Sequence, residues 1–155
     1  MNPNRTSKNI AGDFYTVGHW AKDGEWGDCL DCAIPEAEAP NLLADLLKED
    51  TYTHFVRQPE SVDEIEQACR ACEVCCVNAL RYGGKNKNII QRLFNNPEYC
   101  DYLVTDEGEL KYCLNEKGEQ LPFADKYRVK ANKLLQIKYG KKQSFIQRIC
   151  SVFSS

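Results

Sequence analysis

The sequence lacks the features that mark membrane, secreted and nucleic-acid-binding proteins. No apolar run approaches the roughly 18 residues that cross a bilayer, and residues 1–15, MNPNRTSKNIAGDFY, contain no hydrophobic stretch of the kind that a secretory signal needs. Lys and Arg number 20 against 23 Asp and Glu, which gives a net charge of −3 and no basic surface for nucleic acid. We therefore expect a cytoplasmic protein with no membrane span and no nucleic-acid partner.

Common catalytic motifs are absent as well. The sequence contains no G-x-S-x-G, no H-E-x-x-H, no P-loop and no G-x-G-x-x-G after a strand. The two histidines, His19 and His54, have no surrounding pattern that would make either one the base for a cysteine nucleophile. We expect His54 to be structural, whereas an imidazole at His19 could replace a thiolate on iron. An enzyme is not expected.

Cysteine is what the chain has in excess, with nine in 155 residues. Lasting disulfides are rare in a reducing compartment, so clustered cysteines favour metal ligation or redox chemistry there. The odd number also leaves at least one thiol outside any pure disulfide framework. The cysteines stand at positions 29, 32, 69, 72, 75, 76, 100, 113 and 150.

The first pair, Cys29 and Cys32, forms a C-x2-C motif in a loop rich in Gly and Asp. This spacing lets two thiolates turn towards one metal while backbone amides donate hydrogen bonds to the sulfurs. The motif alone is compatible with half a zinc site, half a cluster site or a thioredoxin-like redox pair. Pro35 argues against the thioredoxin-like redox pair, because that motif should start a long helix and the proline interrupts the segment.

The second group lies on a predicted helix. Cys69, Cys72 and Cys76 are spaced i, i+3 and i+7, which is the pattern of a buried helix face. Free cysteine is among the most buried residue types, so Cys69 and Cys72 are expected to be core residues. Cys75 continues a C-x2-C-x2-C spacing from Cys69, but successive positions on a helix rotate by about 60° and cannot wrap around a cluster.

Local patterns predict short strands and helices up to Gly84. We expect strands at 13–20, 51–56 and 79–82, and helices over 36–50, where Pro40 sits near the start, and from Val62 to about Cys72. Ser61 and Glu64 form a capping box for the second of these helices.

Beyond Gly84 the pattern changes. We expect a helix at 86–96, a hairpin or meander at 99–122, a basic helix at 123–142, and a tail at 143–155 that is either a short helix or disordered. Cys100 and Cys113 flank the hairpin turn; they could form a disulfide or be two unrelated half-buried residues, depending on the strand register.

Two segments together resemble single-cluster bacterial ferredoxins. Residues 29–43, CLDCAIPEAEAPNLL, resemble the cluster loop, which has C-x2-C-x2-C, a short spacer, then Ala-Pro and an apolar pair. Residues 69–84 resemble the other half, in which a helix leads into Cys-Pro-x-x-Ala-Ile and a closing strand. Cys75 falls on the ligand position and Cys76 on the proline, and the resemblance covers about residues 28–84.

The resemblance implies an α+β fold. A small ferredoxin-like domain at 13–84, with short strands and two helices, would follow a flexible N-terminus at 1–12. A C-terminal accessory extension at 85–155 would add a helix, a β-hairpin and a second helix.

It also implies a soluble electron-transfer protein that carries an iron–sulfur cluster, 4Fe-4S or 3Fe-4S, and serves a redox partner protein. Cys29, Cys32 and Cys75 would bind the cluster. Pro35 replaces the third loop cysteine, so the fourth ligand would be Cys76, with Cys72 in reserve. Two alternatives stay open: a cluster-free ferredoxin-like binding or structural module, and a zinc-stabilised interaction domain.

Overall fold

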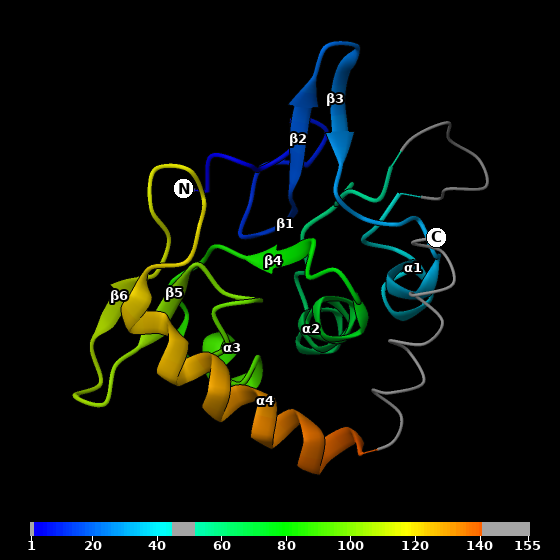
Figure 1. The fold of residues 1–155 in the computed structure, drawn as a ribbon. Coiled ribbons are helices and arrows are strands. Elements are labelled where there is room, and N and C mark those ends of the chain that lie inside the picture. Colours follow the sequence, from blue (N-terminus) through cyan, green and yellow to red (C-terminus); the bar gives the residue numbers. More distant parts are fainter. Residues whose placement is uncertain (1, 45–51, 141–155) are drawn as a thin grey trace.

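Three small antiparallel sheets and four α-helices make up the part of the chain that the computed structural model describes, residues 2–44 and 52–140 (Figure 1). Each sheet has two strands. The expected mixture of helices and short strands is confirmed. Within these residues no helix is both long enough and apolar enough to cross a bilayer.

The central sheet joins two segments that are far apart in the sequence. Strand β1 (Phe14–Thr16) pairs antiparallel with β4 (Leu80–Tyr82), with Phe14 opposite Tyr82 and Thr16 opposite Leu80. All six residues are buried. The expected strand at 79–82 is thus confirmed for its last three residues, and its partner is the N-terminal segment.

The expected single strand at 13–20 is wrong, because it is two strands with different partners. After β1 the chain turns away at Val17, and β2 (Gly18–Ala21) forms a hairpin with β3 (Gly24–Gly27) that projects from the body (Figure 1). Only glycine fits at position 18, since a Cβ there would lie 2.1 Å from the Trp26 carbonyl oxygen.

Helix α2 (Val62–Val74) begins and folds as its sequence predicts. The Ser61 hydroxyl accepts a hydrogen bond from the Glu64 amide, and the Glu64 carboxylate accepts one from the Ser61 amide, which completes the capping box. Cys69 and Cys72 lie on the buried face, as expected. The helix ends at Cys75, its C-cap, and so presents that residue at the edge of the core.

The helix expected over 36–50 is shorter and starts earlier. Helix α1 (Ile34–Glu38) has Pro35 in its first turn, where proline is tolerated because no amide partner is needed. It ends before Pro40, and residues 45–50 of the prediction lie outside the described part of the chain. Glu38 pairs with Arg70 of α2 at 2.9 Å, which holds α1 against that helix.

The strand expected at 51–56 is reduced to one isolated bridge between Leu43 and Phe55. Position 51 itself lies outside the described residues. Backbone hydrogen bonds from the Ala44 amide to the His54 carbonyl oxygen and from the Val56 amide to the Leu42 carbonyl oxygen flank this bridge.

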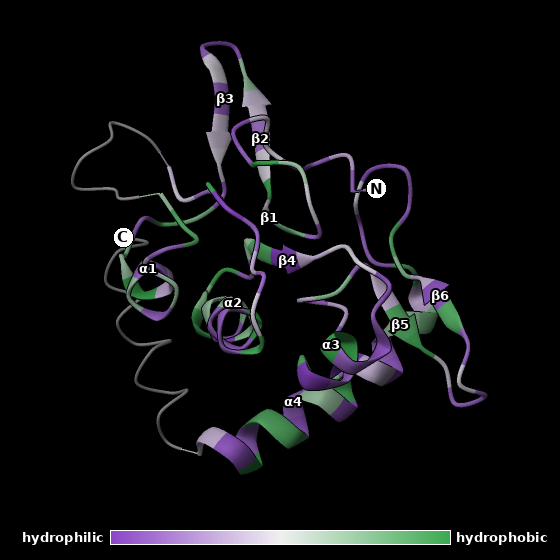
Figure 2. Cartoon of the chain, turned by 180° about the vertical axis from the view of Figure 1, so that it is seen from behind, coloured by the Kyte–Doolittle hydropathy of each residue, from purple (hydrophilic) through white to green (hydrophobic). Residues whose placement is uncertain are grey.

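The elements after Gly84 follow the expected order. They are α3 (Lys87–Arg92), the hairpin strands β5 (Tyr102–Val104) and β6 (Leu110–Tyr112), a 3₁₀ turn (Pro122–Ala124) and α4 (Asp125–Tyr139). The predicted tail at 143–155, which contains Cys150, lies outside the described residues. Seen from behind, α2 and α4 carry both hydrophobic and hydrophilic residues (Figure 2).

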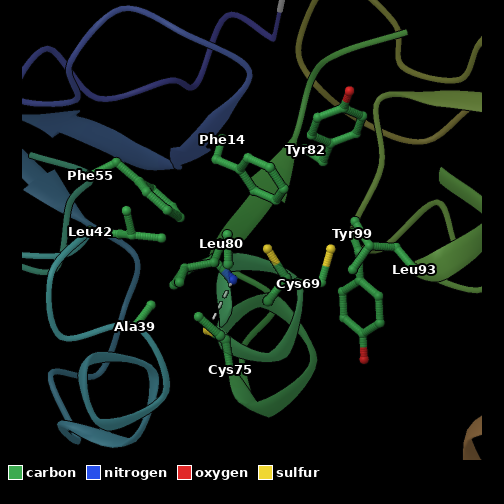
Figure 3. Close-up of a cluster of buried hydrophobic side chains, with 14 of the residues drawn as sticks. Phe14, Ala39, Leu42, Phe55, Cys69, Cys75, Leu80, Tyr82, Leu93 and Tyr99 are labelled. Atoms are coloured by element: carbon green, nitrogen blue, oxygen red, sulfur yellow. Dashed lines mark hydrogen bonds between the residues drawn. The ribbon is translucent and has the colours of Figure 1, made fainter. Parts of the chain in front are cut away.

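One main core joins both parts of the chain. Leu93 and Tyr99 from the extension pack in the same buried cluster as residues of β1, α2 and β4 (Figure 3). Cys100 and Leu135 belong to this cluster as well. A smaller cluster lies under the second hairpin and consists of Leu103, Cys113, Leu114, Ala124 and Tyr127. The region after Gly84 therefore packs onto the first part.

Cys100 and Cys113 do not form a disulfide. Both thiols are free and fully buried, and the Cys113 thiol donates to the Cys100 carbonyl oxygen at 3.2 Å. They are therefore two separate core residues, more deeply buried than the sequence predicts.

Candidate functional site

Two cysteines from distant segments meet in the core. Cys29 lies just after β3, Cys75 caps the end of α2, and their side chains are hydrogen-bonded to each other. Both residues are nearly inaccessible, with 7% and 3% of their surface exposed. The structure thus brings together the two segments that the resemblance pairs.

The turns that follow these cysteines have unusual backbone geometry. Asp31 and Ala33, which flank Cys32, have positive φ angles of 50° and 59°, and Asn78, just after Cys75, has a φ of 54°. Asn and Asp tolerate this left-handed conformation better than most residues, whereas Ala33 adopts it at a cost of the order of 1–3 kcal/mol. Left-handed residues reverse the chain direction and so bend each loop around its own sulfur.

Backbone amides point at the Cys75 sulfur. The Ala79 amide donates to Sγ at 3.3 Å (Figure 3), and the backbones of Val77 and Leu80 also donate to this sulfur. The hydrogen bond from the Cys29 thiol and these amides lower the pKa of Cys75, although burial opposes them. In the same pair, the Cys29 pKa is raised by its hydrogen bond with Cys75 and by burial.

Cys32 is the most accessible of the three thiols Cys29, Cys32 and Cys75. It is half-buried, and its sulfur accepts a hydrogen bond from the backbone of Ile34, while the Cys29 sulfur accepts one from Asp31. Burial raises the Cys32 pKa, and the nearby Cys29 and Glu36 add to the effect. Each of the three sulfurs therefore has at least one backbone amide donor, an arrangement that stabilises thiolates bound to metals.

The resemblance leaves one cluster ligand unassigned, since a cluster normally takes four thiolates. Pro35, which the resemblance aligns with the third loop cysteine, is buried in the first turn of α1. Cys76, the expected substitute, takes part in a disulfide bond. Cys72, the reserve, is fully buried inside the helix face, and burial raises its pKa well above the usual value. Neither expected substitute is therefore a free, accessible thiol.

Among the described residues, no group of three or more His, Cys, Asp or Glu side chains comes close enough to hold one ion. A zinc site draws four ligands to within about 2.3 Å of the metal, whereas the thiolates of a cluster bind different irons and stand farther apart.

Glu36 and Thr53 belong to the site, although the sequence does not reveal them. The Thr53 hydroxyl contacts the carboxylates of Glu36 and Asp31 as well as the Cys29 sulfur. Glu36 Oε2 is buried and has no hydrogen-bond partner. Glu36 directly follows Pro35, and Thr53 comes from a segment that has no motif, so no spacing pattern identifies either residue.

Both histidines have partners of their own. His19 Nδ1 lies 2.7 Å from Asp28 Oδ1 on the exposed hairpin. His54 is buried, and its Nδ1 lies 2.8 Å from the Tyr52 carbonyl oxygen, in keeping with the expected structural role. Imidazole ligation at His19 stays a prediction.

The chain matches no protein-family model, no curated protein and no solved structure. The assignment of a function therefore depends on the site itself.

Proposed function

We propose that this chain is a ferredoxin-type electron-transfer protein whose redox centre is built on Cys29, Cys32 and Cys75. The observation that carries the proposal is the contact between Cys29 and Cys75, because it joins the two segments that resemble the two halves of a cluster site. The chain itself performs no bond chemistry in this proposal. It exchanges electrons with a redox partner protein.

The residues of the chain have distinct parts in this proposal. An iron–sulfur cluster of the 4Fe-4S or 3Fe-4S type, when bound, would supply the one-electron chemistry. The amides of Ala79, Val77 and Leu80 stabilise negative charge at the Cys75 sulfur and so raise the reduction potential. Burial of Cys29 and Cys75 excludes water from the same place and acts in the opposite direction on a charged centre.

In this proposal a 4Fe-4S cluster would take its fourth protein ligand from an oxygen rather than a thiolate. Glu36 is the candidate for this oxygen ligand, because its Oε2 is buried without a hydrogen-bond partner and its carboxylate lies near Cys32. Thr53 holds the other carboxylate oxygen by a hydrogen bond. A cluster with three thiolates and no fourth protein ligand, such as 3Fe-4S, fits the same set of residues.

Metal analysis tests the proposal. Protein purified without oxygen, or reconstituted with iron and sulfide under reducing conditions, is assayed for iron, acid-labile sulfide and zinc, and its visible spectrum is recorded. A brown protein with stoichiometric iron and sulfide is expected. Iron that fails to bind even after reconstitution would refute the proposal, and one tightly bound zinc would point to the zinc-stabilised interaction domain.

A matched pair of variants tests the ligands. Cys29→Ser should lose most of the iron and the visible absorption, because it removes one of the three thiolates. Cys113→Ser should retain both, since Cys113 is also a free, buried cysteine but belongs to the separate small cluster under the second hairpin. Equal loss of iron from the two variants would contradict the assignment.

The second candidate is a cluster-free ferredoxin-like module that binds a partner protein. Pro35 favours it, because the chain has a helix start where the family has a ligand, and so does the lack of a converging three-donor group among the described residues. Absence of iron, sulfide and zinc from the folded, reconstituted protein would select this candidate.

A further inference from the structure

The charge of the chain is divided unevenly along its length. Residues 126–155 contain eight of the 20 basic residues and none of the 23 acidic ones, which gives this segment a charge of +8. Residues 1–125 are left with 12 basic and 23 acidic residues, a net charge of −11. An asymmetry of this size favours contact between the basic part of a chain and an anionic surface.

Helix α4, which begins this basic segment, has two stripes of residues on opposite sides. The buried stripe has a four-residue spacing and consists of Tyr127, Ala131 and Leu135. A second stripe with the same spacing starts two positions later and consists of Val129, Lys133 and Ile137. Two positions on a helix rotate by about 200°, so the second stripe lies on the outer side. Val129 is 54% exposed and Ile137 is 81% exposed. Both views show α4 at one edge of the described molecule (Figures 1 and 2).

The outer side of α4 also carries surplus positive charge. Three basic side chains of the helix have acidic partners: Lys126 with Asp106, Arg128 with Asp125, and Lys138 with Glu73. Lys130 and Lys133 are exposed, and neither forms an ion pair within residues 2–44 and 52–140. Their charges therefore stand beside exposed apolar side chains on the same side of the helix.

The sequence after the helix has the same composition. Residues 141–155, which lie outside the described part of the chain, contain no acidic residue. Their basic residues are Lys141, Lys142 and Arg148, and their large apolar residues are Phe145, Ile146, Ile149, Val152 and Phe153. Basic residues combined with apolar ones are typical of segments that bind the interface of an anionic membrane.

We propose that the outer side of α4, together with the sequence that follows it, docks the chain on an anionic phospholipid surface. Val129 and Ile137 enter the boundary between headgroups and acyl chains, while the long side chains of Lys130 and Lys133 reach the lipid phosphates. A lipid interface fits better than nucleic acid or an acidic protein, because it accepts apolar and cationic side chains from one side of a helix.

The charge of the remaining chain fixes the orientation on this surface. Residues 1–125, with their net charge of −11, are repelled by anionic lipid, so α4 turns towards the membrane. The inference goes beyond the proposed redox function and does not depend on it, since no residue of the outer side belongs to the proposed centre.

Vesicle sedimentation tests the inference. Full-length protein is mixed with vesicles of phosphatidylcholine alone or of phosphatidylcholine with phosphatidylserine, and the bound fraction is measured. We expect binding to the vesicles that contain phosphatidylserine, weakening as salt is added, and little binding to the neutral ones. Equal binding to both kinds of vesicle would overturn the inference. Failure to bind phosphatidylserine would overturn it too, even if the chain bound a DNA duplex or an acidic polypeptide.

A pair of double variants tests the charges. Lys130→Gln with Lys133→Gln should weaken the partition into phosphatidylserine vesicles about 25-fold, because one basic residue near an anionic surface contributes a factor of about five. Lys22→Gln with Lys117→Gln removes the same charge from two exposed positions outside α4 and should weaken it by no more than about twofold. Equal losses would show that net charge alone is responsible and would overturn the docking side.

A second pair tests the apolar contact. Ile137→Gln should weaken the partition about tenfold, because a buried apolar side chain is lost from the lipid interface. Val62→Gln is the matched control, since Val62 is also 81% exposed but lies at the start of α2, and its partition should stay unchanged. An Ile137→Gln variant that binds as well as the wild type would overturn the insertion of this side chain.

Vesicle binding and the metal analysis fail separately. A chain that takes up iron but does not bind phosphatidylserine vesicles refutes the docking surface and leaves the proposed centre standing. A chain that binds the vesicles but never takes up iron does the reverse.

Discussion

At the scale of single residues, the most deeply buried charges lie between the two parts of the chain. Arg81 Nε donates to Asp101 Oδ1 at 3.0 Å, and the Tyr15 hydroxyl donates to the same carboxylate at 2.6 Å. Arg81 also donates to the carbonyl oxygens of Pro97 and Cys100. Burial raises the pKa of Tyr15, so its hydroxyl keeps the proton that it donates.

Asp101→Asn should be strongly destabilising. The change leaves the Arg81 charge buried without its counter-charge, which typically costs about 3–5 kcal/mol in the free energy of unfolding. Urea unfolding followed by circular dichroism measures this cost.

Asp106→Asn is the matched control. Asp106 also pairs with a basic residue, Lys126, at 2.7 Å, but both side chains are mostly exposed. Such a pair contributes about 0–1 kcal/mol. Similar losses in the two variants would show that the buried network does not hold the two parts together.

The sequence could predict only part of the site at this scale. The C-x2-C motif marks Cys29 and Cys32, and resemblance alone selects Cys75 from the cysteines around it. Periodicity places Cys69 and Cys72 correctly in the core, because a helix face is a local property. The positions of Glu36 and Thr53 depend on how distant loops meet, and the disulfide of Cys76 has no local signal at all.

At the scale of elements, the start of α2 is fixed by hydrogen bonds within a few residues. The Glu64 carboxylate accepts hydrogen bonds from the Arg57 guanidinium and from the amides of Glu60 and Ser61. These contacts lower the pKa of Glu64 from its usual 4.5 to about 2, with Arg57 as the largest cause.

The stability that Glu64 contributes should depend on pH. Because the folded pKa lies below the usual value, the contribution is present above about pH 4.5 and is lost as the pH falls from there towards about 2. Wild type and Glu64→Gln should therefore differ most in the midpoint of thermal unfolding at pH 7, and this difference should shrink below about pH 4.5 and become small only near pH 2. A constant difference across this range would show that the carboxylate charge is not involved.

Removal of the Ser61 N-cap hydroxyl gives a second test of how the start of α2 contributes to stability. Ser61→Ala should lower the free energy of unfolding by about 1 kcal/mol, because the Glu64 amide loses its acceptor. Chemical denaturation at neutral pH measures the loss. An unchanged stability would mean that water replaces the hydroxyl without cost.

Elements whose ends are marked by nearby capping or turn residues were predicted correctly. Elements whose limits depend on contacts with distant segments were not. The capping box and the turn signals around Gly108 and Gly118 correctly marked α2 and the second hairpin. The prediction of one strand at 13–20 was wrong. All of this segment favours the extended conformation, and only the different pairing partners of β1 and β2 show where it divides into two strands. Pro40 was placed at a helix start, although Pro35 takes that position in the structure.

At the scale of the whole molecule, α4 closes the core from the side of the extension. Tyr127, Ala131 and Leu135 form its buried stripe, and Leu135 packs into the main cluster together with residues of β1 and α2. The Tyr139 hydroxyl and Arg92 both donate to the Glu73 carboxylate, two residues before Cys75. The extension therefore supports the helix that carries the site.

Two neighbouring leucines test this coupling. Leu135 is 1% exposed, and Leu135→Ala should cost about 2–5 kcal/mol and lower the unfolding midpoint of the entire chain in one transition. Leu134 is 43% exposed, and Leu134→Ala should change stability by no more than about 0.5 kcal/mol. Far-ultraviolet circular dichroism and the reactivity of Cys75 with an alkylating reagent should report the same midpoint for Leu135→Ala. Two separate midpoints would show that the extension unfolds independently.

The projecting β2–β3 hairpin determines what tryptophan fluorescence can report about this protein. Both tryptophans of the chain stand on it, with Trp20 76% exposed and Trp26 51% exposed. Indole emission will hence be nearly silent when the interior melts, since these rings are already in water. The same emission becomes a built-in reporter for anything that lands on the hairpin, and a blue shift on adding a candidate redox partner would locate the contact without any label.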